Sequence, residues 1–245
     1  MRENISPFFR TELLLGKEKM NKIQKSHIAV FGIGGVGSFA TEAIVRCGVQ
    51  NIDIFDGDIV DITNINRQIM ADVETIGQKK TEVMKKRIGL INPNANVNAE
   101  YCFFDKENKD NYNFSKYDYI VDAIDTVTSK ILLIEKANQE NVNIISCMGT
   151  GNKLCPEKLE VSDIYKTSVC PLARVMRKEL KKRNIKNLKV VYSKEKPSYV
   201  PAQDKENPNA KRVNASISFV PSVAGLIIAS EVIKEISKIE SGEWK

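Results

Sequence analysis

Two kinds of hydrophobic pattern alternate along the first 150 residues of the chain. Short apolar runs such as 28–31 lack polar alternation, which is typical of parallel strands buried on both faces. Longer stretches such as 38–47 carry apolar residues at helical spacing. The pattern predicts one or two short helices within 7–24, strands at 28–31, 51–55, 97–104, 117–122 and 143–147, and helices at 38–47, 78–91 and 128–140. This alternation predicts an α/β fold with a doubly wound, Rossmann-like, mostly parallel sheet.

The pattern changes after Gly151. It predicts strands at 159–164, 190–192 and 216–219 and helices at 171–183 and 221–236. Residues 199–212 contain two prolines and no hydrophobic period, so we expect a flexible polar loop there. No linker separates the two parts. We therefore expect residues 1–245 to form a single domain, in which 151–245 is a C-terminal extension of mixed strands and helices.

Composition excludes several classes of protein. The 245 residues are 42% hydrophobic, enough for a substantial core. No apolar run approaches the roughly 20 residues that cross a bilayer, and the N-terminus lacks the apolar segment of a signal peptide. We therefore expect a soluble, cytoplasmic protein with no membrane partner. The five cysteines include no Cys-x-x-Cys pair, which argues against a disulfide framework and a structural zinc site.

The charge is unevenly distributed along the chain. The net charge is +6, yet residues 166–196 contain eleven Lys or Arg against two Glu, a local +9 that leaves −3 for the remainder. An anionic partner is expected to meet the protein at this basic segment if it meets the protein anywhere. Charge alone favours the simpler interpretation, a solvated charged helix.

A glycine-rich turn follows the first predicted strand. It fits the G-x-G-x-x-G pattern, in which backbone N–H groups approach a phosphate at the positive end of the next helix. Glycine turns also serve close packing. The strand before the turn, the helix after it and Asp56, nineteen residues beyond Gly37, favour a nucleotide-binding half at 1–150. The candidate phosphate-binding glycines are Gly32, Gly34, Gly35 and Gly37.

Polar residues follow the second predicted strand. Asp56 and Asp58 lead into Asn64-Ile65-Asn66-Arg67-Gln68, whose amide and guanidinium groups suit a triphosphate. An Asn-rich and Asp-rich turn that binds no ligand is the open alternative. Lys80, at the start of the next helix, is placed to reach the same phosphates, or is a surface lysine like Lys79.

Asp125 follows the predicted strand at 117–122. We expect it in the crevice at the carboxyl ends of the strands, where it would hold Mg²⁺; alternatively, Asp122 and Asp125 cap the following helix. His27 is the only histidine and lies at the opposite end of the first strand, so we interpret it as structural. A reaction such as adenylylation, which makes its own leaving group, would need little acid–base help.

Six ordered motifs together resemble a known family. They are GIGGVGS at 32–38, the Asp56 position, N-x-N-R-Q at 64–68, G-Q-x-K ending at Lys80, INP at 91–93 and DAID at 122–125. The chain resembles the ubiquitin-activating-enzyme-like (ThiF-like) adenylyltransferases over nearly its whole length. Within that family it is most similar to the tRNA threonylcarbamoyladenosine dehydratases. That similarity rests on NRQI at 66–69, DAIDTVTSK at 122–130, L-x-V-x-D-I-x-K-T at 159–167 and PLARVMRKELKKR at 171–183.

The resemblance implies a role for each matching residue in ATP binding. Asp56 would hold the ribose, Arg67 and Lys80 the phosphates, and Asp125 the metal ion, while Asn64 would order the triphosphate. Arg10 would reach the phosphates of the neighbouring subunit, which implies a homodimer formed through the half at 151–245.

The family reaction begins when a carboxylate attacks the α-phosphate of ATP, which releases pyrophosphate and leaves an acyl adenylate. In the dehydratases the carboxylate belongs to the threonyl group of a modified adenosine beside the tRNA anticodon. Its carbamoyl group then displaces AMP and closes a ring, with net loss of water. The basic segment would bind the tRNA through Arg174, Arg177, Lys178, Lys181 and Lys182.

Two alternative functions stay open. The first is activation of the C-terminus of a ubiquitin-like or sulfur-carrier protein, possible partners of this family, although such activators usually carry two Cys-x-x-Cys pairs that this chain lacks. Many also use a crossover-loop cysteine; Cys170 is the only candidate, and we expect a plain surface cysteine there. The second alternative is a nucleotide-binding redox or regulatory module.

Overall fold

The computed structural model describes residues 5–198 and 214–239. Its strands are β1 (His27–Phe31), β2 (Asn51–Phe55), β3 (Asn96–Glu100), β4 (Tyr119–Asp122), β5 (Ile144–Cys147), β6 (Leu159–Asp163) and β7 (Lys189–Ser193). Its helices are α1 (Phe9–Leu15), α2 (Lys17–Lys25), α3 (Gly37–Arg46), α4 (Lys80–Ile91), α5 (Val127–Gln139), α6 (Pro171–Lys182) and α7 (Phe219–Ser237). Short 3-10 turns lie at η1 (Ile62–Asn64), η2 (Lys109–Asn111), η3 (Pro156–Lys158) and η4 (Ile164–Lys166).

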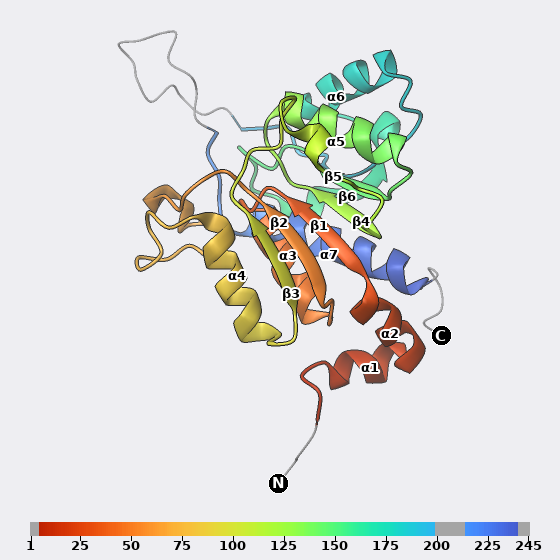
Figure 1. The fold of residues 1–245 in the computed structure, drawn as a ribbon. Helices are drawn as coiled ribbons and strands as arrows, with labels where there is room; N and C mark the ends of the chain where they lie inside the picture. Colours follow the sequence, from red (N-terminus) through yellow and green to blue (C-terminus); the bar gives the residue numbers. More distant parts are fainter. Residues whose placement is uncertain (1–4, 199–213, 240–245) are drawn as a thin grey trace.

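The seven strands form one sheet in the order β3-β2-β1-β4-β5-β7-β6 (Figure 1). All neighbouring strands run parallel except β6, which pairs antiparallel with β7 at the edge. The predicted α/β, mostly parallel sheet is therefore confirmed, and the C-terminal strands continue the same sheet. The strand order reverses between β1 and β4, which is where open sheets of this kind form a ligand crevice.

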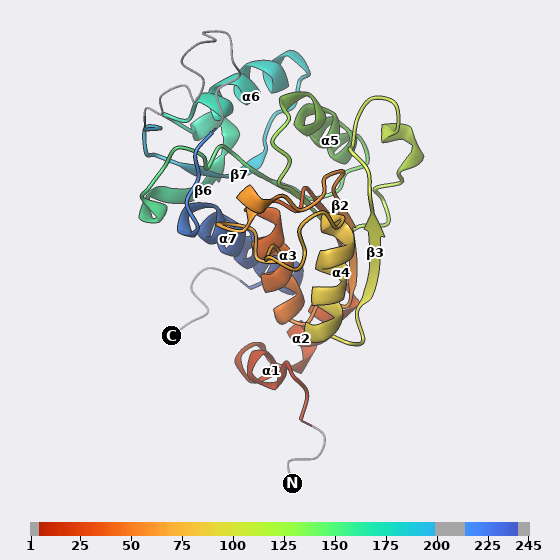
Figure 2. The same cartoon turned by 90° about the vertical axis from the view of Figure 1, so that its left-hand side faces the viewer.

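Strand β1 is buried on both faces, as its unbroken apolar run predicts. Ile28 and Val30 belong to a core cluster built with α3, α4 and α7, whereas Ala29 and Phe31 belong to a second cluster built with α5. Figure 2 shows α3, α4 and α7 gathered together below α5 and α6. The two layers of helices hold the strands between them. Because β1, β2 and β4 run parallel, their carboxyl ends lie at the same edge of the sheet.

The amino end of the sheet is held by a buried carboxylate. Asp53 on β2 accepts hydrogen bonds from the Tyr117 hydroxyl at 2.7 Å and from the Lys116 ammonium at 2.9 Å. The ring of His27, at the start of β1, lies 2.8 Å from the same carboxyl group. This arrangement agrees with a structural role for His27, at the end of the strand away from the crevice.

Several sequence predictions are wrong in detail. The strand predicted at 216–219 is absent, because the backbone at 215 hydrogen-bonds to Asn152 instead of to a strand and α7 begins at Phe219. The third strand ends at Glu100 and not at residue 104. The polar loop predicted at 199–212 lies outside the described residues.

The structure also contradicts the predicted surface position of Cys170 and the alternative capping role of Asp122 and Asp125. Cys170 is buried in the core cluster beneath α6, with 2% of its surface exposed. Neither Asp122 nor Asp125 caps α5, because the helix begins one residue after Thr126 and receives no side-chain cap. Within the described residues, no helix has the length and apolar character needed to span a bilayer.

Candidate nucleotide site

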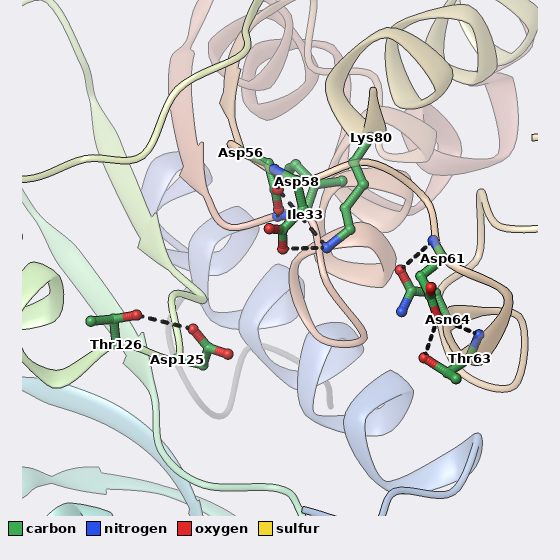
Figure 3. A network of polar contacts seen from close by, with 9 residues as sticks. All are labelled: Ile33, Asp56, Asp58, Asp61, Thr63, Asn64, Lys80, Asp125 and Thr126. Carbon is green, nitrogen blue, oxygen red and sulfur yellow. Dashed lines mark hydrogen bonds and ion pairs between the residues drawn. The ribbon is translucent and has the colours of Figure 1, made fainter. Parts of the chain in front are cut away.

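A cavity of about 560 Å³ opens at the carboxyl ends of β1, β2 and β4, where the strand order reverses. Its polar lining comes from the segments after these three strands and from the start of α4, and it includes every predicted nucleotide-binding residue except Gly37. Those lining residues are Gly32, Gly34, Gly35, Asp56, Asp58, Asn64, Arg67, Gln68, Lys80 and Asp125. Figure 3 shows Asp125 across from the group formed by Asp56, Asp58 and Lys80.

The glycine turn needs glycine at two positions. Gly32 has φ +89°, and a Cβ there would lie 2.7 Å from the carbonyl oxygen of Ala123. A Cβ at Gly37 would collide with the carbonyl oxygen of Gly32. Gly34 differs, because nothing lies within 4 Å of its missing Cβ. The turn is thus packed on the protein side and open on the cavity side, which lets a phosphate approach its backbone N–H groups.

Asp56 joins the end of β2 to the glycine turn. Its carboxylate accepts hydrogen bonds from the backbone N–H of Ile33 at 2.7 Å and of Asp58 at 2.8 Å. The residue is 9% exposed, and burial raises the pKa of its carboxyl group, an effect that the nearby Lys80 ammonium opposes. A carboxylate offers about four lone-pair sites, so acceptor capacity remains for ribose hydroxyls.

Lys80 places an ammonium inside the cavity with few protein partners. Its Nζ lies 2.7 Å from Oδ2 of Asp58 and 3.9 Å from Oδ1 of Asp56, and the residue is 6% exposed. The Asp58 side chain is itself 55% exposed, so this contact is open to competition from an incoming anion. A phosphate is such an anion.

The segment after η1 brings amide and guanidinium groups to the rim. Asn64 lines the cavity and is buried, and its Oδ1 accepts the Asp61 backbone N–H at 3.2 Å. Arg67 donates to the Thr63 carbonyl at 2.7 Å. Gln68 is 5% exposed, and its Oε1 is a buried acceptor without a partner in the described residues.

Asp125 presents a carboxylate to the cavity from the turn after β4. The residue is exposed, and its Oδ1 accepts only a long hydrogen bond, 3.3 Å, from the Thr126 hydroxyl. No cluster of three or more His, Cys, Asp or Glu side chains that could hold a metal occurs in the described ranges. A single free carboxylate suits Mg²⁺, which proteins often hold through one or two carboxylates together with substrate phosphates.

A family comparison places the chain among known proteins. The model of the ThiF family matches residues 9–244. The chain belongs to the ThiF family. Within it, the chain belongs with the tRNA threonylcarbamoyladenosine dehydratases, as its motifs predict.

Two similar proteins show the extent of this agreement. A tRNA threonylcarbamoyladenosine dehydratase of Bacillus subtilis is 42% identical over 241 residues, which cover 94% of each chain. The crystal structure of the Escherichia coli tRNA N6-threonylcarbamoyladenosine dehydratase in complex with ATP has a TM-score of 0.85 and 32% identity, and the match covers 95% of this chain and 94% of that one. The same E. coli protein has also been solved in complex with AMP.

The apolar side of this ThiF family site was not predicted. Phe31, Phe55 and Phe104 line the cavity next to Asp56 and are buried, whereas Phe103 is 61% exposed at its rim. The Phe103 ring lies so close to the backbone of Gly57 that a Cβ there would come within 2.6 Å of it. The sequence signal that could have predicted this apolar lining is the pair Phe103 and Phe104, shortly after the third strand.

A second unpredicted part of the lining lies beyond β5. It comprises residues 147–151, Leu172, residues 214–216 and Pro221. Beneath it, Lys153 is 3% exposed and donates to the Gly149 carbonyl at 2.6 Å. Burial lowers the pKa of this ammonium. The lining residues beyond β5 border the same cavity as Asp56.

Arg10 does not reach this cavity within its own subunit. It lies on α1, at the amino end of the sheet, and it is exposed. Figure 1 shows α1 at the far end of the molecule from the carboxyl ends of the strands. Its role toward ATP therefore stays a prediction that requires a second subunit.

The basic helix α6 has one buried and one exposed face. Ala173, Met176 and Leu180 are buried against the core, whereas Arg174, Lys178 and Lys181 are exposed. The two other predicted tRNA-binding residues contact other residues of the chain, although the Lys182 side chain is itself 58% exposed. Arg177 donates to the Thr167 carbonyl at 3.0 Å, and Lys182 pairs with Glu179 at 2.7 Å.

Proposed function

We propose that this ThiF family protein is an ATP-dependent tRNA threonylcarbamoyladenosine dehydratase. The observation that carries the proposal is the full-length similarity to dehydratases, combined with one cavity that gathers Asp56, Lys80 and Asp125. The substrate is a tRNA that carries N6-threonylcarbamoyladenosine. The product is the cyclised, dehydrated nucleoside.

In this proposal, ATP lies along the cavity from the apolar compartment to the glycine turn. The base lies near Phe103, and Asp56 accepts hydrogen bonds from the ribose hydroxyls. Lys80 exchanges its contact with Asp58 for a phosphate, because a multiply charged phosphate attracts the ammonium more strongly than a half-exposed carboxylate. Arg67 and the Asn64 amide also line the cavity, and they complete the anion site.

The first chemical step is attack of a threonyl carboxylate oxygen on the α-phosphorus of ATP. The bond to the bridging oxygen breaks, and pyrophosphate leaves with its electron pair. Lys80 and Arg67 stabilise the negative charge that develops on the phosphate oxygens in the transition state. Fixed cations at this position lower the activation barrier of the reaction. Asp125 would hold Mg²⁺, which supplies further neutralisation of the phosphates.

The second step closes the ring within the substrate. The carbamoyl group of the modified adenosine attacks the activated carbonyl carbon and AMP leaves, so the two steps together remove one water. No enzyme thioester is needed. Cys170 fits this account, because it is buried at the start of α6 and burial leaves a thiol unreactive.

We further propose that the enzyme acts as a cytoplasmic homodimer. Helix α1 supports a dimer, because none of its residues is buried and Leu13 and Leu14 are 69% and 63% exposed. A partner subunit that packs on α1, in addition to the expected interface in the half at 151–245, would cover these side chains and would bring Arg10 toward the second active site. A sulfur-transfer or carrier protein is a further possible partner within this proposal.

The tRNA would lie across α6, where Arg174, Lys178 and Lys181 point to solvent. These side chains have the positive charge and exposure that binding to backbone phosphates requires. The residues from 151 onward thus form the substrate side of the enzyme.

Exchange of radiolabelled pyrophosphate into ATP tests the adenylylation step. We expect exchange to require both Mg²⁺ and tRNA that carries the threonylcarbamoyl group, and to be absent with unmodified tRNA. Exchange that is stimulated by a small protein ending in Gly-Gly, and not by the modified tRNA, would instead show a carrier-protein adenylyltransferase. Tight NAD binding with no exchange would show a redox or regulatory module.

A further inference from the structure

A fully buried ion pair lies beneath the turn that carries Asp125. Lys130 on α5 and Asp122 at the end of β4 are both 0% exposed. Nζ of Lys130 lies 2.9 Å from Oδ2 of Asp122 and donates to the Ile124 carbonyl at 3.0 Å. Ser146 on β5 donates its hydroxyl to the same Asp122 oxygen. The network joins two strands and a helix around one short turn.

This network fixes the backbone of the turn at residues 123–125. The Ile124 N–H donates to Oδ1 of Asp122 at 3.2 Å, while its carbonyl accepts from Lys130. The Ala123 N–H donates to the Phe31 carbonyl at the end of β1 at 2.8 Å. Both polar backbone groups of Ile124 are therefore held just before the chain reaches Asp125.

The glycine turn rests on the same segment. A Cβ on Gly32 would lie 2.7 Å from the Ala123 oxygen and 3.0 Å from the Ile124 nitrogen. A Cβ on Gly37 would lie 3.1 Å from the Ala123 Cβ. The 123–125 turn thus packs against the glycine turn through its first two residues and carries the Asp125 carboxylate on its last. A displacement of the turn would move both groups relative to each other.

A buried ion pair contributes little net stability, because desolvation of two charges offsets their attraction. What Lys130 adds is a directed hydrogen bond to one carbonyl in the turn. We propose that Lys130 is a positioning residue of the ATP site, which sets the distance between the glycine turn and Asp125. This inference rests on the proposed ATP-dependent function, and it assigns Lys130 a role through the Ile124 carbonyl and not through contact with ATP.

The test uses a variant that leaves no charge unpaired. In the double variant Lys130→Met, Asp122→Asn, the amide oxygen at 122 can still accept the Ile124 N–H, and the amide NH2 group can donate to the Ser146 hydroxyl, which rotates to accept. The main change is then removal of the hydrogen bond to the Ile124 carbonyl. Calorimetric titration with ATP at stepped Mg²⁺ concentrations measures binding without turnover. We expect the Mg²⁺ concentration for half-maximal ATP binding to rise by about ten- to a hundredfold and the rate of pyrophosphate exchange to fall by a similar factor. This is the usual effect of removing groups that orient metal-binding residues.

Asp53→Asn is the matched control, because Asp53 is another buried, paired carboxylate but lies at the amino end of the sheet. It should lower the urea midpoint of unfolding and leave the Mg²⁺ dependence unchanged. Ser146→Ala, which removes one hydroxyl from the network, provides a milder second variant and should shift the Mg²⁺ dependence in the same direction.

Unchanged ATP binding and Mg²⁺ dependence in folded double and Ser146→Ala variants would overturn the inference. An equal shift in Asp53→Asn would overturn it as well, because the effect would then follow stability alone. If the wild-type protein binds ATP but exchanges no pyrophosphate, adenylylation fails as the function, while the binding measurements still decide the role of Lys130.

Discussion

The carboxylate of Asp56 accepts the backbone N–H of Ile33 at 2.7 Å, and this hydrogen bond ties the end of β2 to the glycine turn that follows β1. One side chain therefore shapes the phosphate-binding turn and also faces the cavity where a ribose would lie. The ribose and phosphate parts of the site are coupled through it.

We expect Asp56→Ala to weaken ATP binding by about ten- to a hundredfold, because a charge-assisted hydrogen bond contributes roughly 1.5–3 kcal/mol. Calorimetric titration with ATP measures the change. Asp72→Ala is the control, because Asp72 also accepts backbone N–H groups in a turn, from Glu74 and Thr75, but lies outside the cavity lining. Equal ATP affinity in Asp56→Ala and wild type would remove Asp56 from the site.

The position of Arg10 at the far end of its own subunit predicts complementation between two inactive variants. Arg10→Ala and Lys80→Ala should each lose pyrophosphate exchange. After the two proteins are mixed and allowed to exchange subunits, each mixed dimer has one complete site, so about a quarter of wild-type activity should return.

The control for this experiment is a mixture of Lys80→Ala with Asp125→Ala, two residues that line the same cavity of one subunit. This mixture should stay inactive, because every site then lacks either Lys80 or Asp125. If the Arg10→Ala mixture also stays inactive while subunit exchange is demonstrated, Arg10 does not act across the dimer.

The exposed face of α6 predicts a salt-dependent contribution to tRNA binding. Replacing Arg174, Lys178 and Lys181 with Gln should reduce the slope of log affinity against log salt by about 0.7–0.9 for each phosphate that the helix no longer neutralises. Fluorescence anisotropy of labelled tRNA over a salt series measures the slope. The same number of charges removed at Lys85, Lys86 and Lys106, exposed lysines on and after α4, should leave it unchanged. An unchanged slope in the α6 variant would leave this face as a solvated surface.

The lowered pKa of the Asp53 carboxyl group predicts how the stability of the fold depends on pH. Burial alone would raise the pKa of its carboxyl group, but hydrogen bonds from Tyr117, His27 and Lys116 outweigh burial and hold that pKa below its ordinary value. The ionised group therefore stabilises the fold above the unfolded pKa of about 3.9, and this stability is lost as pH falls through the lower folded pKa.

Asp53→Asn should thus lower the free energy of unfolding at pH 7 by about 1–3 kcal/mol and flatten its decline below about pH 4. Urea unfolding at stepped pH measures both effects. Asp110→Asn, at an exposed position, should change neither. A decline of the same steepness in Asp53→Asn and wild type would show that other carboxyl groups control acid unfolding.

The sequence predicted the parallel sheet because its strands are buried on both faces, so Ile28 to Phe31 forms an unbroken apolar run. It also predicted the polar lining, because the carboxyl ends of parallel strands meet at one edge and bring Asp56 and Asp125 together. The local sequence pattern was sufficient to predict the position of a residue wherever its place in its own strand or helix determines which residues it contacts.

Long-range contacts explain what the sequence could not predict. Residues 216–219 have a strand-like pattern, but the backbone just before them, at 215, hydrogen-bonds to Asn152 instead of joining the sheet, and residues 214–216 border the cavity. The burial of Cys170 depends on how α6 packs on the core. The hydrogen bond from Lys130 to the Ile124 carbonyl spans only six residues, but it depends on the angle at which α5 follows β4. The hydrophobic periodicity of the sequence does not encode such contacts.

The most direct test of the proposed function is nucleoside mass spectrometry of the tRNA product. Purified protein is incubated with ATP, Mg²⁺ and tRNA that carries threonylcarbamoyladenosine, and Asp125→Asn and ATP-free reactions serve as controls. We predict that the modified nucleoside loses the mass of one water, with formation of one AMP for each nucleoside cyclised, only in the complete wild-type reaction. An unchanged nucleoside mass in a preparation that binds both ATP and the modified tRNA would contradict the proposed function.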